Sequence, residues 1–268
     1  MAADDKITPA NPLEAARRLT APVRLRRFYK KVEMPVEEGG FVLRLDGKRA
    51  ITPGKNTLAV PRRDLAEAIV AEWDAQGEFI TPASMPVTRL ANSAIDGVAS
   101  RLAEVRADVL AYAGADLLCY RAGEPEGLVE RQHSVWDPII AWAERRFSGR
   151  FVLAEGVVHV AQPEPTLAAI RTVIERFDTP FRLAGLSLAT TLSGSALIAL
   201  ALAEGALDVE TAWAAAHVDE DWNIEKWGED AEAAQRRAKR LADFRAAALA
   251  LRLRSLLPEG EGAREAGG

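Results

Sequence analysis

The spacing of apolar residues in this chain changes once, near residue 64, and this change limits the folds open to it. Between Phe41 and Ile51, strand-like runs flank Asp46-Gly47, a pair that favours a tight hairpin turn because both turn residues need positive φ. From residue 64 onward, apolar residues recur every three or four positions, as on one face of a helix. Strands followed by helices, without βαβ alternation, predict an α+β fold: a small antiparallel β-rich N-terminal domain followed by a larger all-α C-terminal domain.

The same pattern predicts how the chain divides. We expect a flexible N-terminal tail over 1–24, a β-rich domain with one helix over 25–84, a helical domain over 85–255 and a disordered tail over 256–268. The boundary is placed in the Pro-rich stretch Thr81–Pro86, and the final tail is rich in Gly and Glu.

Several helical elements have predicted limits. Asp137-Pro138 favours a helix start, or alternatively a kink inside a longer helix over 129–147. The apolar run from Leu186 to Ala203 predicts one buried helix, and the last helix is expected over 230–253. Two short apolar runs, 151–153 and 157–160, predict a hairpin around Gly156.

Composition excludes several classes of function. A net charge of -5 argues against sequence-independent DNA binding. A single cysteine, Cys119 in an apolar stretch, rules out an internal disulfide and indicates an inert buried thiol in a reducing compartment. The first twelve residues resemble neither a secretory signal nor a transit peptide. Phosphate-binding loops are absent from the sequence, and Leu192–Ala196 lacks the G-x-S-x-G arrangement of a nucleophilic serine.

The stretch DEDWNIEKWGED, residues 219–230, combines two tryptophans with a dense acidic run. Tryptophan beside charge is typical of a surface that binds another protein. The alternative is that the tryptophans pack inward while the acids face water. The candidate partner-binding residues are Asp219, Glu220, Asp221, Trp222, Glu225 and Trp227.

A metal site is a second hypothesis for the same stretch. His217 and Asp221 are four residues apart and would share one face of a helix, with Asp219 close by. Imidazole and carboxylate ligands could hold a divalent ion in a metal-dependent hydrolase. Against this, the sequence offers no second ligand cluster, and acids at a helix N-terminus also favour its dipole.

Trp73 lies on the apolar stripe of the helix predicted over 64–76. We therefore expect it to be a structural residue, together with Asp46 and Gly47 of the hairpin turn.

Several short segments occur in the same order as in the ATP-twelve family, and the chain therefore resembles this family. Its members are assembly chaperones of the F-type ATP synthase. The resemblance extends from about residue 26 to residue 253 and is carried by Arg27–Val32, Leu45–Lys48, Thr52-Pro53, Ala71–Trp73, Met85–Thr88 and Trp222–Gly228.

The resemblance implies a protein that is not an enzyme and needs no cofactor. It implies binding to the free alpha subunit of the synthase's catalytic head, protection from aggregation, and release for assembly with the beta subunit. It also implies a β-rich N-terminal part, a helical C-terminal part, a monomer, and a bacterial cytoplasmic location. An acidic residue just before the first tryptophan of the WNIEKWG motif is associated with function, which points to Asp219, Glu220 or Asp221, with Glu220 preferred.

Overall fold

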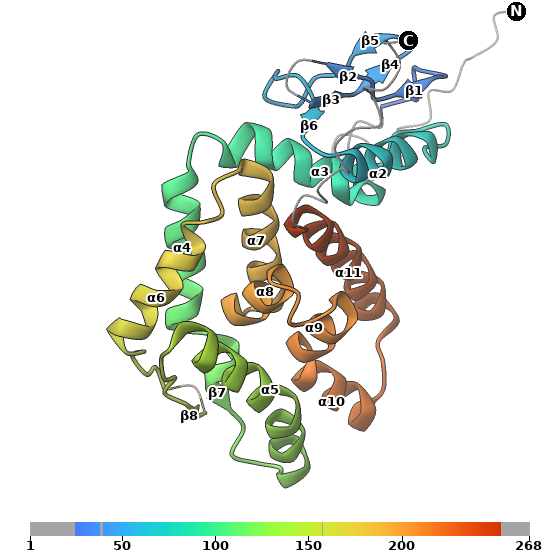
Figure 1. Ribbon diagram of the computed structural model, residues 1–268. Helices are drawn as coiled ribbons and strands as arrows, with labels where there is room; N and C mark the ends of the chain where they lie inside the picture. The colour runs from blue at the N-terminus through green and yellow to red at the C-terminus, as the bar shows by residue number, and fades with distance from the viewer. Residues whose placement is uncertain (1–24, 38–39, 157, 253–268) are drawn as a thin grey trace, which may run out of the picture.

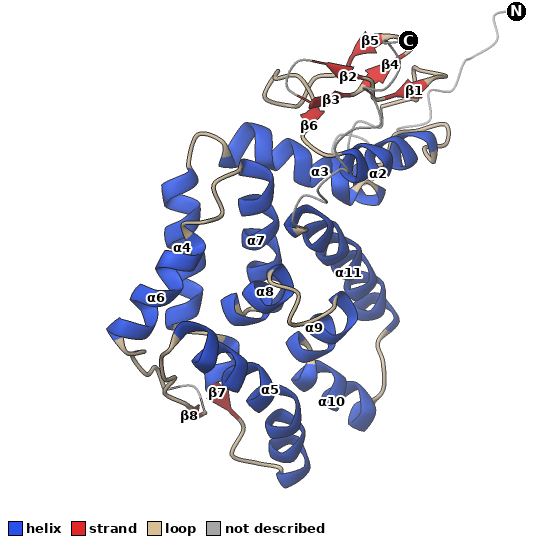
Figure 2. Cartoon of the chain, viewed as in Figure 1, coloured by secondary structure: helices blue, strands red, loops and turns tan. Residues whose placement is uncertain are grey.

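The computed structural model describes residues 25–37, 40–156 and 158–252. A small layer of strands lies at one end of the molecule, and a larger body of helices makes up the rest (Figures 1 and 2). The expected α+β order, strands first and helices afterwards, is confirmed. The predicted tails over 1–24 and 256–268 fall outside the described residues.

The N-terminal strands form two small antiparallel sheets, in the orders β1-β4-β5 and β2-β3-β6. The strands are β1 (Val32–Glu33), β2 (Val36–Glu37), β3 (Gly40–Val42), β4 (Arg44–Leu45), β5 (Lys48–Arg49) and β6 (Ala59–Val60).

The turn between β4 and β5 is the predicted hairpin. Asp46 and Gly47 have φ of 49° and 79°, and Leu45 pairs with Lys48 across the turn. The Asp46 carboxylate also accepts hydrogen bonds from the backbone N–H groups of Lys30 (3.0 Å) and Lys31 (2.8 Å). Asp46 therefore shapes the turn and also fastens the segment that precedes β1.

The helices of the body surround α7, which packs against α4 on one side and α11 on the other (Figure 1). Gly185 of α7 makes the second contact possible, because a Cβ there would lie 2.9 Å from the carbonyl oxygen of Ala247 in α11. The helices are α2 (Arg63–Asp74), α3 (Pro86–Ser93), α4 (Leu102–Gly114), α5 (Glu126–Phe147), α6 (Glu164–Ile174), α7 (Pro180–Ser193), α8 (Ala196–Ala203), α9 (Val209–Ala216), α10 (Val218–Trp227) and α11 (Ala231–Leu251).

Short elements connect these helices. They are the 3-10 turns η1 (Pro82–Ser84) and η3 (Leu117–Cys119), the π-helical turn η2 (Ala94–Val98), and the strands β7 (Tyr120–Arg121) and β8 (Ala154–Glu155), which pair in parallel. None of the described helices is both long and apolar enough to span a membrane.

Buried apolar side chains form two clusters. One fills the helical body, and the other joins the strand layer to α2, α3 and the ends of α7 and α11 through Ala184, Ala246 and Ala250. Trp73 packs against this second cluster, beside Tyr29 at a ring separation of 5.4 Å. Val87 of α3, which follows the predicted domain boundary at residues 84–85, belongs to the same cluster as the strand layer. The division of the chain into two domains at that point therefore stays a prediction.

The prediction of one helix over 186–203 is wrong. The chain breaks at Gly194, which has φ of 70°, and a new helix, α8, begins at Ala196 with Ser195 as its N-cap. The buried Asp116 carboxylate causes the break, because it accepts hydrogen bonds from the Ser195 hydroxyl (2.6 Å) and the Leu197 N–H (3.0 Å). A continuous helix would use that N–H group internally, so Asp116 stabilises a second helix start.

The expectations for Pro138 and for Gly156 can now be compared with the structure. α5 continues through Pro138, so the longer helix is confirmed, while the Asp137 carboxylate pairs with Arg121 (2.8 Å) and does not cap a helix. The hairpin around Gly156 is wrong, because β8 pairs with β7. The Gln162 side chain instead bonds both backbone groups of Val152, at 2.9 Å each.

Candidate functional site

Helix α10 carries the acidic, tryptophan-containing stretch and lies at the edge of the helical body, between α5 and the start of α11 (Figure 1). It begins after His217, whose ring packs against that of Trp213 with centroids 3.8 Å apart and the planes tilted by 34°. The His217 Nδ1–H group donates to the Trp213 carbonyl oxygen at 2.8 Å. Gly228, with φ of 89°, ends the helix and turns the chain toward α11.

Asp219, Asp221 and Glu225 are held by side chains of neighbouring helices. Asp219 accepts a hydrogen bond from the Gln132 amide (2.7 Å), and Asp221 forms an ion pair with Arg237 (2.5 Å). Glu225 accepts two hydrogen bonds from Arg131, at 2.8 and 2.7 Å, and this guanidinium lowers the pKa of the Glu225 carboxyl. These three acids therefore fasten α10 to α5 and α11.

Glu220 differs from the other three acids of the helix. Among the described residues, no lysine or arginine lies within ion-pair distance of it, and the nearest basic atom is His217 Nε2 at 3.8 Å. Burial lowers the pKa of His217, so its imidazole is neutral at pH 7. The Glu220 side chain is 38% exposed, and its negative charge has no internal counter-charge in the described part of the chain.

The two tryptophans of α10 have opposite surroundings. Trp222 is half-buried on Gly127 of α5, where a Cβ would come within 2.7 Å of the indole ring. Arg131 and Lys226 lie over the Trp222 ring, at 5.2 and 4.5 Å from its centroid. Trp227 is 85% exposed. The inward-packing alternative therefore holds for Trp222 and is wrong for Trp227.

A hollow of about 460 Å³ lies between α10 and α11. The apolar residues lining it are Ile224, Trp227, Ala233 and Ala234, and the charged ones are Glu220, Glu229, Asp230 and Arg237. Glu220 and Trp227 thus line the same hollow. Asp230 serves mainly as the N-cap of α11, because its carboxylate accepts a hydrogen bond from the Ala233 N–H at 2.7 Å.

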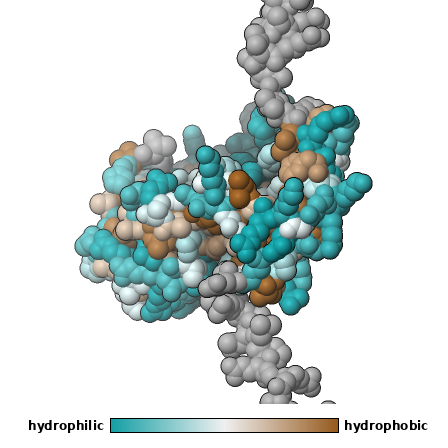
Figure 3. Space-filling model, turned by 90° about the horizontal axis from the view of Figure 1, so that it is seen from above, coloured by the Kyte–Doolittle hydropathy of each residue, from teal (hydrophilic) through white to brown (hydrophobic). Residues whose placement is uncertain are grey.

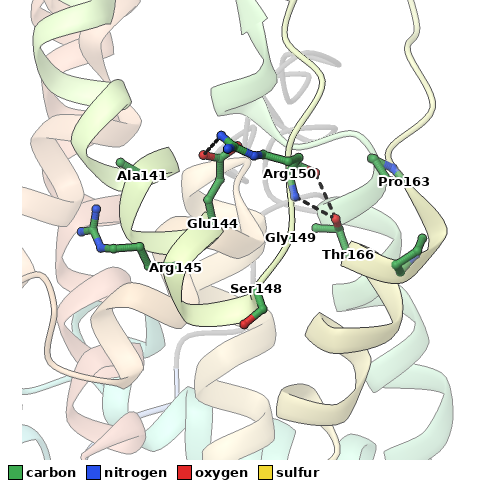
Figure 4. Close-up of a pocket in the computed structure, with 9 residues that line it drawn as sticks. Ala141, Glu144, Arg145, Ser148, Gly149, Arg150, Pro163 and Thr166 are labelled. Carbon is green, nitrogen blue, oxygen red and sulfur yellow. Dashed lines mark hydrogen bonds and ion pairs between the residues drawn. The ribbon is translucent and has the colours of Figure 1, made fainter.

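A larger hollow, of about 600 Å³, lies between the end of α5 and the start of α6 (Figure 4). Its polar groups bond to one another: Arg150 pairs with Glu144 at 3.3 Å, and the Thr166 hydroxyl donates to the Arg150 carbonyl oxygen at 3.0 Å. No large apolar side chain lines it. It therefore offers a partner less apolar surface than the hollow at α10.

The metal-dependent hydrolase hypothesis is not supported. His217 donates to Trp213 inside the body, whereas Asp219 binds Gln132 and Asp221 binds Arg237, so the three proposed ligands face different partners. The described residues contain no group of three or more His, Cys, Asp or Glu side chains placed to hold a metal ion.

Cys119 is buried as expected, and burial raises the pKa of its thiol to about 12. It is therefore a structural side chain and not a nucleophile.

Sequence reasoning missed the residues that hold α10 in place. Gln132, Arg131 and Gly127 come from α5, and Arg237 comes from α11. None of these belongs to a recognisable motif, and the α5 residues lie more than eighty positions away in the chain. Only the packing of α10 against α5 and α11 identifies them.

Comparison with known proteins gives a consistent result. The family model described as ATP12 chaperone protein matches residues 26–144. The protein atp12 of Schizosaccharomyces pombe mitochondria is 23% identical over 215 residues, which span 76% of this chain and 74% of that protein. The α10 surface lies beyond the residues that the family model matches.

Two solved bacterial structures are more similar. A putative chaperone from Agrobacterium tumefaciens is 50% identical, with a TM-score of 0.81 over 90% of this chain and 91% of that one. Atp12 from Paracoccus denitrificans is 41% identical, with a TM-score of 0.77 over 85% of this chain and 97% of that one. From the shared fold and this degree of identity, the chain belongs to the ATP12 family, the F1-ATPase assembly chaperones.

Proposed function

We propose that this chaperone binds the free alpha subunit of F1-ATPase through Glu220, Trp227 and the α10–α11 hollow that they line. The observation that carries the proposal is the exposure of Trp227, at 85%, beside a carboxylate with no internal partner among the described residues. Tryptophan is among the residue types that dominate the energetics of many protein interfaces, and charged residues set the choice of partner. Asp219, Asp221, Trp222 and Glu225 support the surface by holding α10 in place.

Binding alone would account for chaperone action. An alpha subunit outside its hexamer exposes interfaces that are buried after assembly, and such surfaces aggregate. A protein that covers them lowers the concentration of aggregation-prone subunit by mass action, and assembly with beta then displaces it. We propose on this basis a monomeric chaperone that works without ATP hydrolysis or a cofactor, and the bacterial relatives favour the cytoplasm as its place of action.

The proposal is tested by co-expressing the chain with the alpha subunit of the same organism, followed by size-exclusion chromatography with mass detection. We expect a soluble one-to-one complex and an insoluble alpha subunit when the chaperone is left out. No complex, together with no gain in alpha solubility, would contradict the proposal.

A charge-reversing variant tests the surface itself. Glu220→Lys should weaken the complex and lower the melting temperature only slightly, because among the described residues Glu220 has no lysine or arginine partner to lose and its contribution is limited to the helix dipole. The matched control is Glu67→Lys on α2, an exposed helical glutamate for which the described residues provide no ion pair. Equal binding by the two variants would remove Glu220 from the interface.

A further inference from the structure

The hollow between α10 and α11 has a chemistry that defines what it can bind. We propose that it takes a segment of the client in which a lysine or arginine lies close to a large apolar side chain. The cation would pair with Glu220, and the apolar side chain would occupy the space beside Trp227. This inference rests on the proposed function, because it assumes that the hollow contacts the client.

The walls of the hollow are largely apolar. Ile224 and Trp227 form one wall, and Ala233 and Ala234 form the other. The alanines have little bulk, which leaves the space between the helices open. An apolar side chain placed there would cover part of the Trp227 ring, and burying apolar surface contributes about 25 cal/mol for each Å².

The charged residues around the hollow determine which charge a bound segment should carry. Glu220, Glu229 and Asp230 line it, and the one cation among the described residues that line it, Arg237, is already paired with Asp221 at 2.5 Å. Lys226 does not line the hollow, because its ammonium group lies over the Trp222 ring at 4.5 Å. The described lining residues therefore carry more negative than positive charge, which favours a cation over an acidic segment or a nucleic acid.

The surroundings of Glu220 leave its carboxylate open to a cation from outside the chain. His217 lies behind the Glu220 carboxylate, and its Nε2 atom is buried without a hydrogen-bond partner, in a side chain only 3% exposed. Arg237 and Arg240 both lower the pKa of His217, in addition to burial, and keep the ring neutral. Because no lysine or arginine of the described residues lies within ion-pair distance of Glu220, its partly exposed carboxylate stays available to a cation of the client.

The first arm of the test fills the hollow. Ala234→Trp places a bulky ring in the space between the helices, and Ala107→Trp, on an exposed position of α4, is the matched control. We expect Ala234→Trp to weaken binding to the full-length alpha subunit by about tenfold or more, with the control unchanged. Unchanged affinity of Ala234→Trp, while wild type binds, would overturn this inference and leave the proposed function intact.

The second arm identifies the client's cation. Every lysine and arginine of the alpha subunit is replaced by glutamate, one at a time, and each variant is tested against the Glu220→Lys chaperone. We expect at least one of these alpha variants to restore binding, with a large apolar residue near the replaced position. A complete set without any restoration would overturn the inference, and failure of wild type to bind alpha at all would overturn the proposed function with it.

Discussion

The contact between the strand layer and the helical body differs sharply from the outer surface of α10 and α11. At the first, Asp96 of η2 accepts hydrogen bonds from Thr52 Oγ1 (2.6 Å), the Gly54 N–H (2.7 Å) and Asn56 Nδ2 (2.8 Å). Gly54 is required there, because a Cβ would lie 2.6 Å from the Asp96 carboxyl carbon. At the second, Glu220 and Trp227 have no such partners among the described residues.

Arg62 is a second charged residue that has internal partners at the contact between the strand layer and the helical body. Arg62 donates hydrogen bonds to the carbonyl oxygens of Leu249 (2.6 Å) and Ala250 (3.4 Å), at the C-terminal end of α11 where a cation complements the helix dipole. The Asp64 carboxylate accepts two hydrogen bonds from the same guanidinium, at 2.9 and 2.6 Å, and so orients it.

Exposed large apolar residues are scattered elsewhere, and Figure 3 shows a mostly hydrophilic surface with separate apolar patches.

The comparison teaches that residue type alone does not separate structure from function in this chain. Acids and tryptophans occur in both regions, and the difference lies in whether the fold gives each one an internal partner. Where partners exist, substitution should act on stability. Where they are absent, substitution should act on binding.

The largest effect is expected from Trp73→Ala. Its ring packs beside Tyr29 in the cluster that joins the strand layer to α7 and α11, so truncation should lower the free energy of unfolding by about 3 kcal/mol. Chemical denaturation measures the change. The affinity of the remaining folded protein for the alpha subunit should not change, and a selective loss of affinity would place Trp73 in the interface.

A comparable effect should appear in the pH dependence of stability at Asp116. Burial raises the pKa of this carboxyl from 3.8 to about 6, so its favourable contribution is complete below pH 4 and is lost as the pH rises through 6. Between pH 4 and pH 7, the stability of wild type relative to Asp116→Asn should fall by about 2 kcal/mol. Denaturation of both proteins at the two pH values tests this, and a constant difference would contradict it.

Trp227→Ala is the same substitution as Trp73→Ala, made in the other region. It should weaken binding to the alpha subunit by about 2 kcal/mol, roughly thirtyfold in Kd. The melting temperature should not fall, because the ring is 85% exposed in the chaperone alone. Calorimetric titration and thermal melting together check the prediction, and a lower melting temperature with normal affinity would reverse the assignment.

The smallest effect is expected from Glu225→Gln. Glu225 has an internal partner, Arg131, as residues of the strand–body contact do, but its side chain is exposed, as the outer surface of α10 is. The ion pair with Arg131 lowers the pKa of Glu225, so the pair stabilises the fold above the unfolded pKa of Glu225 and stops doing so as the pH falls through its folded pKa. Exposed pairs contribute little, so the melting temperature at pH 7 should fall only slightly. At acid pH the variant and wild type should melt alike.

Local signals in the sequence predicted much of the fold. Asp46-Gly47 identified the hairpin because the turn geometry depends on those two residues alone. The break at Gly194 could not be predicted in this way, because it depends on Asp116, which lies 79 residues from Ser195 along the chain. Contacts between distant segments were the missing information.

The candidate site shows the same limit. The acidic run and its tryptophans were visible in the sequence, but Trp222 and Trp227 could not be told apart there. Gly127 of α5 gives Trp222 a place to pack, and Trp227 has no equivalent in the described residues. Glu220 was separated from Asp219, Asp221 and Glu225 only by the positions of Gln132, Arg237 and Arg131.

Hydrogen–deuterium exchange of the chaperone, alone and saturated with the alpha subunit, shows which surface the client covers. We expect slower exchange in peptides covering α10 and the first turns of α11, with little change in the strand layer. Protection confined to other parts of the chain, with α10 and the start of α11 exchanging as in the free protein, would contradict it.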